Sequence, residues 1–290
     1  MDLEARVRQL PCWQGEVKVE PLHGGLSNVS YVVTDMAGRH VVRFGEDLPF
    51  HHVSRRRELM VAHGAAKAGF GPQIEYSAPG VVVSTFIEAV TMSAESVRAN
   101  PLRIGELLRR FHNEMPANIS GEAYLFWVFH VIRDYARILA AGNSRWASDL
   151  EAYISLANEL EKAQIALPIV FGHGDLLPAN FLDDGKRLWL IDFEYAGFST
   201  AMFDLAGAAA NAEMNEAQAR ALLTAYFGKE PDPPLWRAFS AMQAAALLRE
   251  AMWGMISEQH MKVPGVDYGA YAQENLARLA PSLERFRAIA

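Results

Sequence analysis

Three residues with oxygen-bearing side chains stand close together in the middle of the sequence. Asp175 lies in the segment HGDLLPAN, Asn180 follows it by five positions, and Asp192 comes after the apolar run LWLI. A carboxylate beside a hydroxyl can accept its proton, and carboxylate and amide oxygens are ligands that suit Mg²⁺. Because phosphoryl transfer is catalysed mainly by positioning and by neutralising charge, this order of side chains favours that chemistry.

Each of these residues alone has a simpler explanation, since an Asp near a turn most often stabilises it through its own side chain. The combination is what favours catalysis, with Asp175 as base and the other two as metal ligands. His173 is expected to support the loop, because phosphoryl transfer requires no second base. Asp204, in MFDLAG, can accept backbone N–H groups of this loop, and it can also cap the next helix.

A second group of residues near the N-terminus could contact phosphates. The segment HGGLSNVSYVV places two glycines, Ser27 and Asn28 in a turn between strands, where backbone N–H groups can approach an anion, although a plain hairpin is the simpler reading. Arg43 stands among apolar residues in VVRFG, and a partly buried cation needs a partner. Glu58, on the following helix, is the nearest candidate, and Arg43 would then contact nucleotide phosphates.

The elements that must position these residues form two parts. Residues 1–87 predict a small antiparallel sheet with one helix, because VKVEPL, NVSYVVTD, RHVVRFG and VVVSTFI have strand character and residues 54–68 have helical spacing before GFGP. Residues 88–290 are expected to be mainly helical, including long amphipathic stretches over 125–164 and 216–286. One amphipathic face comprises Ile104, Leu107, Leu108, Phe111 and Met115. The fold class is therefore α+β with two lobes.

Composition narrows the class of protein further. The chain has 290 residues, 51% of them hydrophobic, and a net charge of −7, which is typical of a globular domain. The basic residues are scattered apart from the run 55–57, so nucleic acid is not an expected partner. No apolar run reaches the roughly 18 residues that cross a bilayer, so neither membrane insertion nor export is expected. Cys12 has no partner for an internal disulfide, and the cytoplasm is the expected compartment.

Taken together, the glycine-containing turn, the cationic strand, the helical Glu, HGD-x4-N and IDFE resemble the aminoglycoside phosphotransferase and choline kinase superfamily, whose fold is similar to that of eukaryotic protein kinases. GGLSNVSY, VVRFG, GFGP, IDFEYAG, FDLAG and AMWGMISEQ look like the choline/ethanolamine kinase branch. The resemblance spans nearly the whole chain. It implies an ATP- and Mg²⁺-dependent kinase that phosphorylates the hydroxyl of an amino alcohol, choline or ethanolamine, with nucleotide in the first lobe and acceptor in the second.

The resemblance also assigns roles residue by residue. It makes Asp175 the base, with Asn180 and Asp192 as the Mg²⁺ ligands. Several residues of the first lobe would bind the nucleotide, through the phosphates or, for the last three, through backbone contacts to adenine: Ser27, Asn28, Arg43, Glu58, Ser84, Phe86 and Ile87. A carboxylate and three aromatic rings would hold the acceptor's cationic group: Glu194, Trp253, Tyr268 and Tyr271.

Two residues depart from the aromatic site of choline kinases, so fewer aromatic rings are expected there. Ile256 stands where choline kinases usually present a second Trp, and Val266 replaces an aromatic residue before the following Tyr. Trp253 can therefore line a cation cage or pack in the core, since its helix neighbours are apolar. The same catalytic pattern serves kinases of thiamine, aminoglycosides and other small alcohols, so the acceptor remains open, as does the oligomeric state, for which a homodimer is a common default.

Two further classes compete with a kinase. A non-catalytic nucleotide-binding module would usually lack the base, a metal ligand or the phosphate cation, and here all are present. A metal-dependent hydrolase would use His173, Asp175 and Asp192 as ligands. The remaining His residues lack the pairing typical of metal sites apart from His51 and His52, which adjoin a turn, so this class ranks last.

Overall fold

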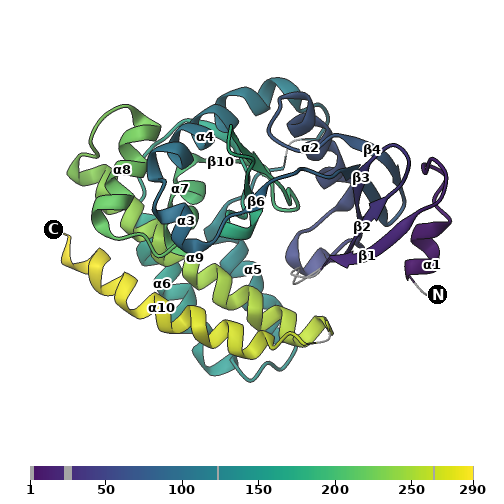
Figure 1. The fold of residues 1–290 in the computed structure, drawn as a ribbon. Helices are drawn as coiled ribbons and strands as arrows, with labels where there is room; N and C mark the ends of the chain where they lie inside the picture. The colour runs from purple at the N-terminus through teal and green to yellow at the C-terminus, as the bar shows by residue number, and fades with distance from the viewer. Residues whose placement is uncertain (1–2, 23–27, 123, 264, 290) are drawn as a thin grey trace.

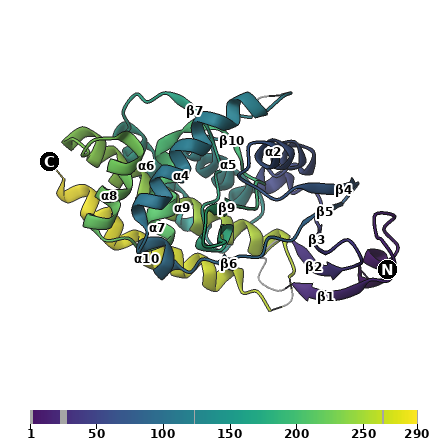
Figure 2. The same cartoon turned by 45° about the horizontal axis from the view of Figure 1, so that its top comes forward.

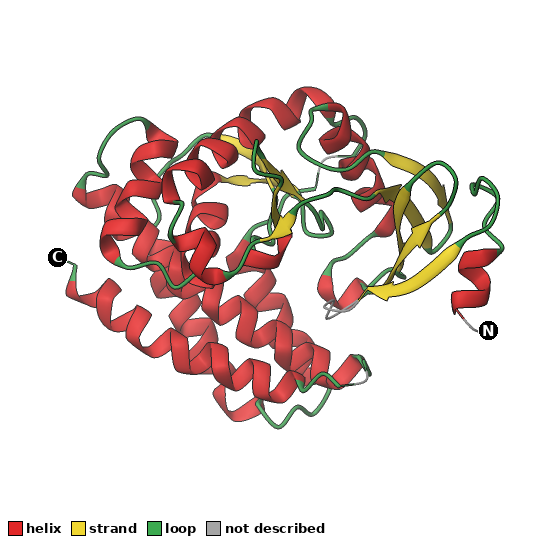
Figure 3. Ribbon diagram, in the orientation of Figure 1, coloured by secondary structure: helices red, strands yellow, loops and turns green. Residues whose placement is uncertain are grey.

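The computed structural model describes residues 3–22, 28–122, 124–263 and 265–289. Figure 1 shows two parts: a sheet beside the N-terminus and a larger assembly of helices that contains the C-terminus. Coloured by secondary structure, most strands gather in the first part and the second is mainly helical (Figure 3). The predicted α+β class, with a small N-terminal antiparallel sheet and a larger helical part, is confirmed.

The N-terminal sheet has five strands, and every neighbouring pair in it is antiparallel. A short helix, α1 (Leu3–Arg8), precedes it. In spatial order the strands are β1 (Lys18–Leu22), β2 (Val29–Thr34), β3 (Arg39–Phe44), β5 (Val81–Thr85) and β4 (Ile74–Ala78). Val33, Val42 and Val83 are fully buried and form one apolar cluster with Phe44 and Val7. Because successive side chains of β3 point to opposite faces, Arg43 lies on the face opposite this cluster.

Helix α2 (Arg55–Lys67) follows a short 3₁₀ turn, η1 (Pro49–His51), as the spacing of its apolar residues predicts. Its buried residues Val61 and Ala65 belong to the large core of the helical part, and they are absent from the cluster under the sheet. The helix therefore ties the sheet to the larger part. The division between residues 87 and 88 stays a prediction.

The larger part is built mainly from helices. They are α3 (Ala94–Arg98), α4 (Pro101–Glu114), α5 (Val128–Ala141), α6 (Leu150–Lys162), α7 (Ala201–Asn211), α8 (Glu216–Phe227), α9 (Pro233–His260) and α10 (Tyr268–Ala288), with 3₁₀ turns η2 (Met115–Asn118) and η3 (Ala147–Asp149). The expected apolar face of α4 is buried throughout. Burying each such side chain stabilises the fold by roughly 1.5–3 kcal/mol. None of the described helices has the length and apolarity to cross a membrane.

Helix α9 is the central element of this part. It packs against α5, α7 and α10, and nearly every residue from Ala238 to Ser257 is buried. Figure 2 shows it surrounded by the other helices. A helix that is apolar all round is stable only in such a position. Any charged side chain on its middle turns must therefore be paired inside the protein.

Short strands frame the segment HGDLLPAN. β7 (Ile169–Gly172) precedes it and pairs with β10 (Gly197–Thr200), while η4 (Pro178–Asn180) forms its end and β8 (Phe181–Asp183) follows. β8 lies between β6 (Val90–Thr91) and β9 (Leu188–Leu190) in a three-stranded sheet. The loop from His173 to Leu177 is thereby fixed at both ends by paired backbone.

Candidate active site

Asp204 holds the loop that carries Asp175. Its Oδ2 accepts the backbone N–H of His173 at 2.6 Å, and its Oδ1 accepts that of Gly174 at 2.8 Å. His112 Nε2 lies 2.8 Å from the same carboxylate. Burial alone would raise the pKa of Asp204, but the hydrogen bonds from His112 and from the loop hold that pKa below its usual value. The predicted support of the loop by Asp204 is confirmed.

His173 is buried and has both ring nitrogens engaged. Its Nε2–H donates to the carbonyl of Ile191 at 3.0 Å, and its Nδ1 accepts the backbone N–H of Asp175 at 3.3 Å. Burial lowers the pKa of the imidazole, which favours the neutral ring. A ring used in this way supports the loop and has no nitrogen left for a metal, which removes a ligand from the hydrolase hypothesis.

Gly174 is required by the loop's backbone. Its φ is +80°, a left-handed conformation that glycine adopts most readily. A Cβ on this residue would lie 2.6 Å from the carbonyl oxygen of Tyr195. The sequence HGD thus contains a position where any side chain would move Asp175 away from its neighbours.

The structure brings the three oxygen-bearing residues together. Asn180 Nδ2 donates to the backbone oxygen of Asp175 at 2.8 Å and to its Oδ2 at 3.2 Å. The backbone oxygen of Asn180 accepts the N–H of Ile191 at 3.1 Å, so the residue before Asp192 lies directly beside it. Burial is the main cause that raises the pKa of Asp175 well above its ordinary value, and the nearby charge of Glu250 acts in the same direction.

These side chains fit a hard cation. Because Asn180 turns its nitrogen toward Asp175, its side-chain oxygen is the atom that can bind a metal. Asp192 supplies a carboxylate, and its φ of +65° is rare for a residue other than glycine. Such strain is common where a side chain must be aimed for function. An amide oxygen and a carboxylate are ligands that Mg²⁺ takes together with phosphate oxygens.

Two arginines from the N-terminal part link it to this loop. Arg43 forms the expected ion pair with Glu58, and its Nη1 also donates to Asp192 Oδ1 at 2.6 Å. Arg55 Nη1 donates to Glu58 Oε2 at 2.7 Å and to Glu194 Oε2 at 2.8 Å. The cations of the sheet and of α2 thus reach Asp192 and Glu194, which follow strand β9.

Asn28 and Glu194 belong to the same network. Asn28 Oδ1 accepts from Arg55 Nη2 at 2.8 Å, and its Nδ2 donates to Glu194 Oε2 at 3.3 Å. Glu194 is buried, and burial raises the pKa of its carboxyl group while Arg55 opposes that rise. Its carboxylate is therefore bound by two residues of the N-terminal part, Asn28 and Arg55. Ser27 lies outside the described residues.

The segment expected to meet adenine crosses from the sheet to the helical part. Ser84 lies within β5 opposite Val41, and Ile87 lies in the irregular segment that follows. The Phe86 N–H donates to the carbonyl of Arg39 at 2.9 Å, and the Arg39 guanidinium lies 3.7 Å from the centre of the Phe86 ring. The backbone N–H of Phe86 is therefore already used inside the protein.

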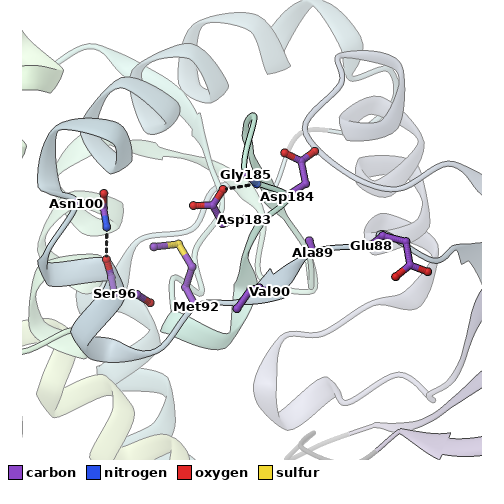
Figure 4. A pocket seen from close by; sticks show the side chains of 9 residues that line it. All are labelled: Glu88, Ala89, Val90, Met92, Ser96, Asn100, Asp183, Asp184 and Gly185. Carbon is purple, nitrogen blue, oxygen red and sulfur yellow. Dashed lines mark hydrogen bonds between the residues drawn. The ribbon is translucent and has the colours of Figure 1, made fainter.

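A pocket of about 680 Å³ begins one residue further on (Figure 4). Its wall combines the connecting segment from Glu88 to Met92 with the end of β8, the β8–β9 turn, Ser96 of α3 and Asn100, the residue before α4. Asp183, the last residue of β8, accepts the Gly185 N–H at 3.0 Å and is paired with Arg103 at 2.6 Å. The pocket adjoins the expected adenine segment, but neither that segment nor Asp175 lines it.

The aromatic residues expected around the acceptor do come together. Trp253 stacks on His51 with ring centres 5.0 Å apart, and the rings of Tyr268 and Tyr271 are steeply inclined to it, with their centres 5.8 and 5.6 Å from its own. Its Nε1 donates to the Tyr195 hydroxyl at 2.8 Å. Trp253 and Tyr268 are each only 5% exposed. These two rings are packed in the core.

Comparison with known proteins decides the family. The choline/ethanolamine kinase family model matches residues 19–226. The chain belongs to the choline/ethanolamine kinase family. A probable ethanolamine kinase of Arabidopsis thaliana is 28% identical over 208 residues, which cover 64% of this chain and 54% of that protein. The chain thus spans about half the length of that relative.

Two further relatives cover more of the chain. Protein LicA of Haemophilus influenzae is 24% identical over 269 residues, 87% of this chain and 76% of LicA. The crystal structure of a choline/ethanolamine kinase family protein from Mesorhizobium loti has a TM-score of 0.76 and 30% identity, and the match covers 98% of this chain and 96% of that one. The predicted resemblance to the family is confirmed.

The sequence patterns did not indicate two charged residues of this region, Arg55 and Glu250. Arg55 has a visible signal, because it stands three residues before Glu58 on a helix, a spacing that allows pairing. The sequence signal for Glu250 is weaker. This residue forms an ion pair with Arg249 and accepts the Tyr271 hydroxyl at 2.8 Å, yet both charges lie inside the apolar stripe of α9. Two adjacent charges in a stripe of core residues are the only hint the sequence offers.

Proposed function

We propose that the protein is an ATP- and Mg²⁺-dependent kinase that phosphorylates the hydroxyl of an amino alcohol of the choline or ethanolamine class. The observation that carries this proposal is the convergence of Asp175, Asn180 and Asp192 at one loop. Residues 1–87 would bind the nucleotide, and residues 88–290 would supply the catalytic residues and the acceptor site. Family membership supports a phosphotransferase that acts on an alcohol.

Asp175 would orient the acceptor hydroxyl and take its proton as the phosphoryl group is transferred. Asn180 keeps this carboxylate in place through its amide nitrogen. Asn180 and Asp192 would hold Mg²⁺, which neutralises charge on the nucleotide phosphates when it is bound. Asp204 fixes the loop backbone, so Asp175 loses little freedom when the acceptor arrives.

On the nucleotide side, Arg43 would contact the phosphates, with Glu58 orienting its guanidinium. Ser27 and Asn28 would lie over the phosphates, and the backbone of Ser84, Phe86 and Ile87 would face adenine. Because Phe86 N–H already donates to Arg39, its carbonyl group is the part of that residue left for the base. Arg43 and Arg55 place two cations where the triphosphate would bring its charge.

On the acceptor side, the proposed residues are Glu194, Trp253, Tyr268 and Tyr271. Tyr271 is the member whose hydroxyl contacts a second carboxylate, Glu250, near the base. Burial and the charge of Glu250 raise the pKa of Tyr271 well above its ordinary value, so it acts as a hydrogen-bond donor. An aromatic hydroxyl and carboxylates suit a cationic acceptor.

The test is a panel of acceptors supplied with ATP and Mg²⁺: ethanolamine, choline, thiamine and an aminoglycoside. ADP release and phosphorylated product are measured for the wild type, for Asp175→Asn and for Asp149→Asn, an exposed carboxylate remote from the loop. We expect product with an amino alcohol, a loss of at least about 10³-fold in Asp175→Asn, and normal activity in the control. No turnover with any acceptor, or an active Asp175→Asn, would contradict the proposal.

A further inference from the structure

A narrow cavity lies against Asp175, between α7 and α9. Its wall includes the carboxyl-bearing residues Asp175, Asp204 and Glu250, the amide of Asn211, and two residues with little or no side chain, Gly207 and Ala246. Its volume is about 10 Å³, close to the space that holds a single water molecule. The cavity is therefore large enough for one small polar group that lies beside the catalytic carboxylate.

Glu250 is held rigidly at this cavity. Arg249 pairs with its Oε1, and Tyr271 donates to its Oε2 at 2.8 Å. The side chain lies on the buried middle part of α9 and is itself buried. Apolar residues of similar size usually serve a core as well as or better than a buried ion pair. The stability of the core therefore does not account for the Arg249–Glu250 ion pair, so its place beside the proposed base makes it a candidate for function.

The polar groups around the cavity suit a cation. Three carboxyl groups line it, those of Asp175, Asp204 and Glu250, and both oxygens of Asp204 already accept N–H groups of the loop. Arg249, the partner of Glu250, is fully buried and lies 4.3 Å from the centre of the Tyr195 ring. Two of its nitrogens, Nε and Nη2, have no hydrogen-bond partner, and the ring face compensates them in part. A cation at the cavity would face carboxyl groups on its wall, and the described residues that line the cavity include no cationic side chain.

Asn211 adds a neutral acceptor to the same wall. Its Nδ2 donates to the carbonyl of Leu176 at 3.2 Å, so its side-chain oxygen is the end that can accept a hydrogen bond. A primary ammonium carries three N–H donors, and Glu250, Asn211 and Asp175 offer oxygens around one small space. A hydroxyl two carbons from such an ammonium stays next to Asp175.

A quaternary ammonium has none of these advantages. It has no N–H to donate and is held instead by exposed aromatic faces. Trp253 is 5% exposed, with His51 stacked on its ring and the rings of Tyr268 and Tyr271 steeply inclined to it. Three methyl groups also exceed the volume of a cavity made for one water. The site therefore offers hydrogen-bond acceptors in place of a cage.

We propose that this cavity binds the ammonium group of a primary amino alcohol and that Glu250 is the residue that selects it. The inference rests on the proposed kinase function and deepens it by naming the acceptor class. It predicts that efficiency falls as methyl groups are added to the acceptor nitrogen.

The first experiment compares ethanolamine, its N-methyl and N,N-dimethyl derivatives, and choline as acceptors for the wild type. We expect kcat/KM to fall stepwise, by at least about 30-fold from ethanolamine to choline, because each methyl removes a donor and adds volume. Choline used as well as ethanolamine would overturn the inference and leave the kinase proposal standing.

The second experiment changes the cavity itself. Glu250→Gln should raise the KM for ethanolamine by about 30-fold while the KM for ATP stays within about twofold. Ala246→Val fills the space without altering charge and should have the same effect, which covers the case in which Glu250→Gln leaves Arg249 unpaired and misfolds. Glu258→Gln, an outer residue of the same helix paired with Arg145, is the matched control and should behave as the wild type.

A binding measurement separates failure of this inference from failure of the proposed function. Calorimetry follows ethanolamine added to the protein with Mg²⁺ and a non-hydrolysable ATP analogue. Binding by the wild type that Ala246→Val abolishes supports the cavity, even if no acceptor is turned over and the kinase proposal falls. No binding by the wild type, or an unchanged ethanolamine KM in both cavity variants, would overturn the assignment.

Discussion

Asp204 Oδ1 accepts the backbone N–H of Gly174 at 2.8 Å, although the two residues lie 30 positions apart. The other carboxylate oxygen accepts the neighbouring N–H of His173. One side chain from α7 therefore fixes two consecutive peptide groups next to the proposed base. The loop's shape depends on a contact that no local sequence rule supplies.

Replacing Asp204 with Asn should damage catalysis more than nucleotide binding. An amide can accept only one of the two N–H groups and turns a donor toward the other, so the loop loses about 2 kcal/mol of support. We expect kcat to fall by about 30-fold, with the KM for ATP nearly unchanged, in steady-state assays. Asp232→Asn is the control, because either residue can cap α9. Equal kcat in wild type and Asp204→Asn would disprove this role.

A comparison of Gly174→Ala with Gly228→Ala separates the effect of backbone strain from that of a steric clash. The new Cβ would lie 2.6 Å from the Tyr195 carbonyl, and the left-handed backbone adds about 1 kcal/mol. Gly228→Ala shares a positive φ, +73°, but its Cβ would meet nothing within 4 Å. In urea unfolding we expect Gly228→Ala to lose about 1 kcal/mol and Gly174→Ala clearly more, with activity lost only in the latter. Equal losses in both would show that the clash is relieved.

The parts that the sequence predicts well are those set by local spacing. Asp175 and Asn180 are five residues apart around a Pro-led turn, so their proximity needs no distant contact. The alternating strands of the sheet and the apolar face of α4 follow from the same kind of short-range pattern. Arg43 and Glu58 were predictable as a pair because a partly buried cation must be neutralised.

The parts that the sequence misses depend on tertiary packing. β4, with alternating exposed and half-buried residues at the sheet edge, carries too weak an apolar signal. Arg55 meets Glu194 across 139 positions. Glu250 lies on a helix buried on every side, where periodicity cannot mark one face as the site. Whether Trp253 packs or binds is likewise decided by the residues that cover it.

Asp192→Asn should change the dependence of activity on Mg²⁺. The substitution keeps the shape of the side chain but removes the charge that would hold the cation. We expect the Mg²⁺ concentration for half-maximal activity to rise by at least about tenfold, and chelation with EDTA to stop turnover in the wild type until Mg²⁺ is restored. Because Arg43 also binds Asp192, the KM for ATP should rise as well.

Asp149→Asn provides the comparison for that titration, since it removes an exposed carboxylate elsewhere. A Mg²⁺ dependence in Asp192→Asn that matches both the wild type and this control would exclude Asp192 as a ligand. An activity loss that Mg²⁺ cannot rescue at any concentration would instead assign Asp192 to the positioning of Arg43.

His40 should make the N-terminal sheet more stable at low pH. Burial alone would lower the pKa of its imidazole, but hydrogen bonds to Asp35 at 3.0 Å and to Glu75 at 2.6 Å raise it above the ordinary 6.5. The native state therefore holds the proton more tightly than the unfolded chain, so the stabilisation is full below pH 6.5 and is lost as pH rises through the native pKa. His40→Asn should cost about 1 kcal/mol in urea unfolding at pH 5.5, and clearly less at pH 8.5, relative to the wild type at the same pH. A cost for His40→Asn that stays constant or grows from pH 5.5 to 8.5 would show that the ring acts as a neutral packing group.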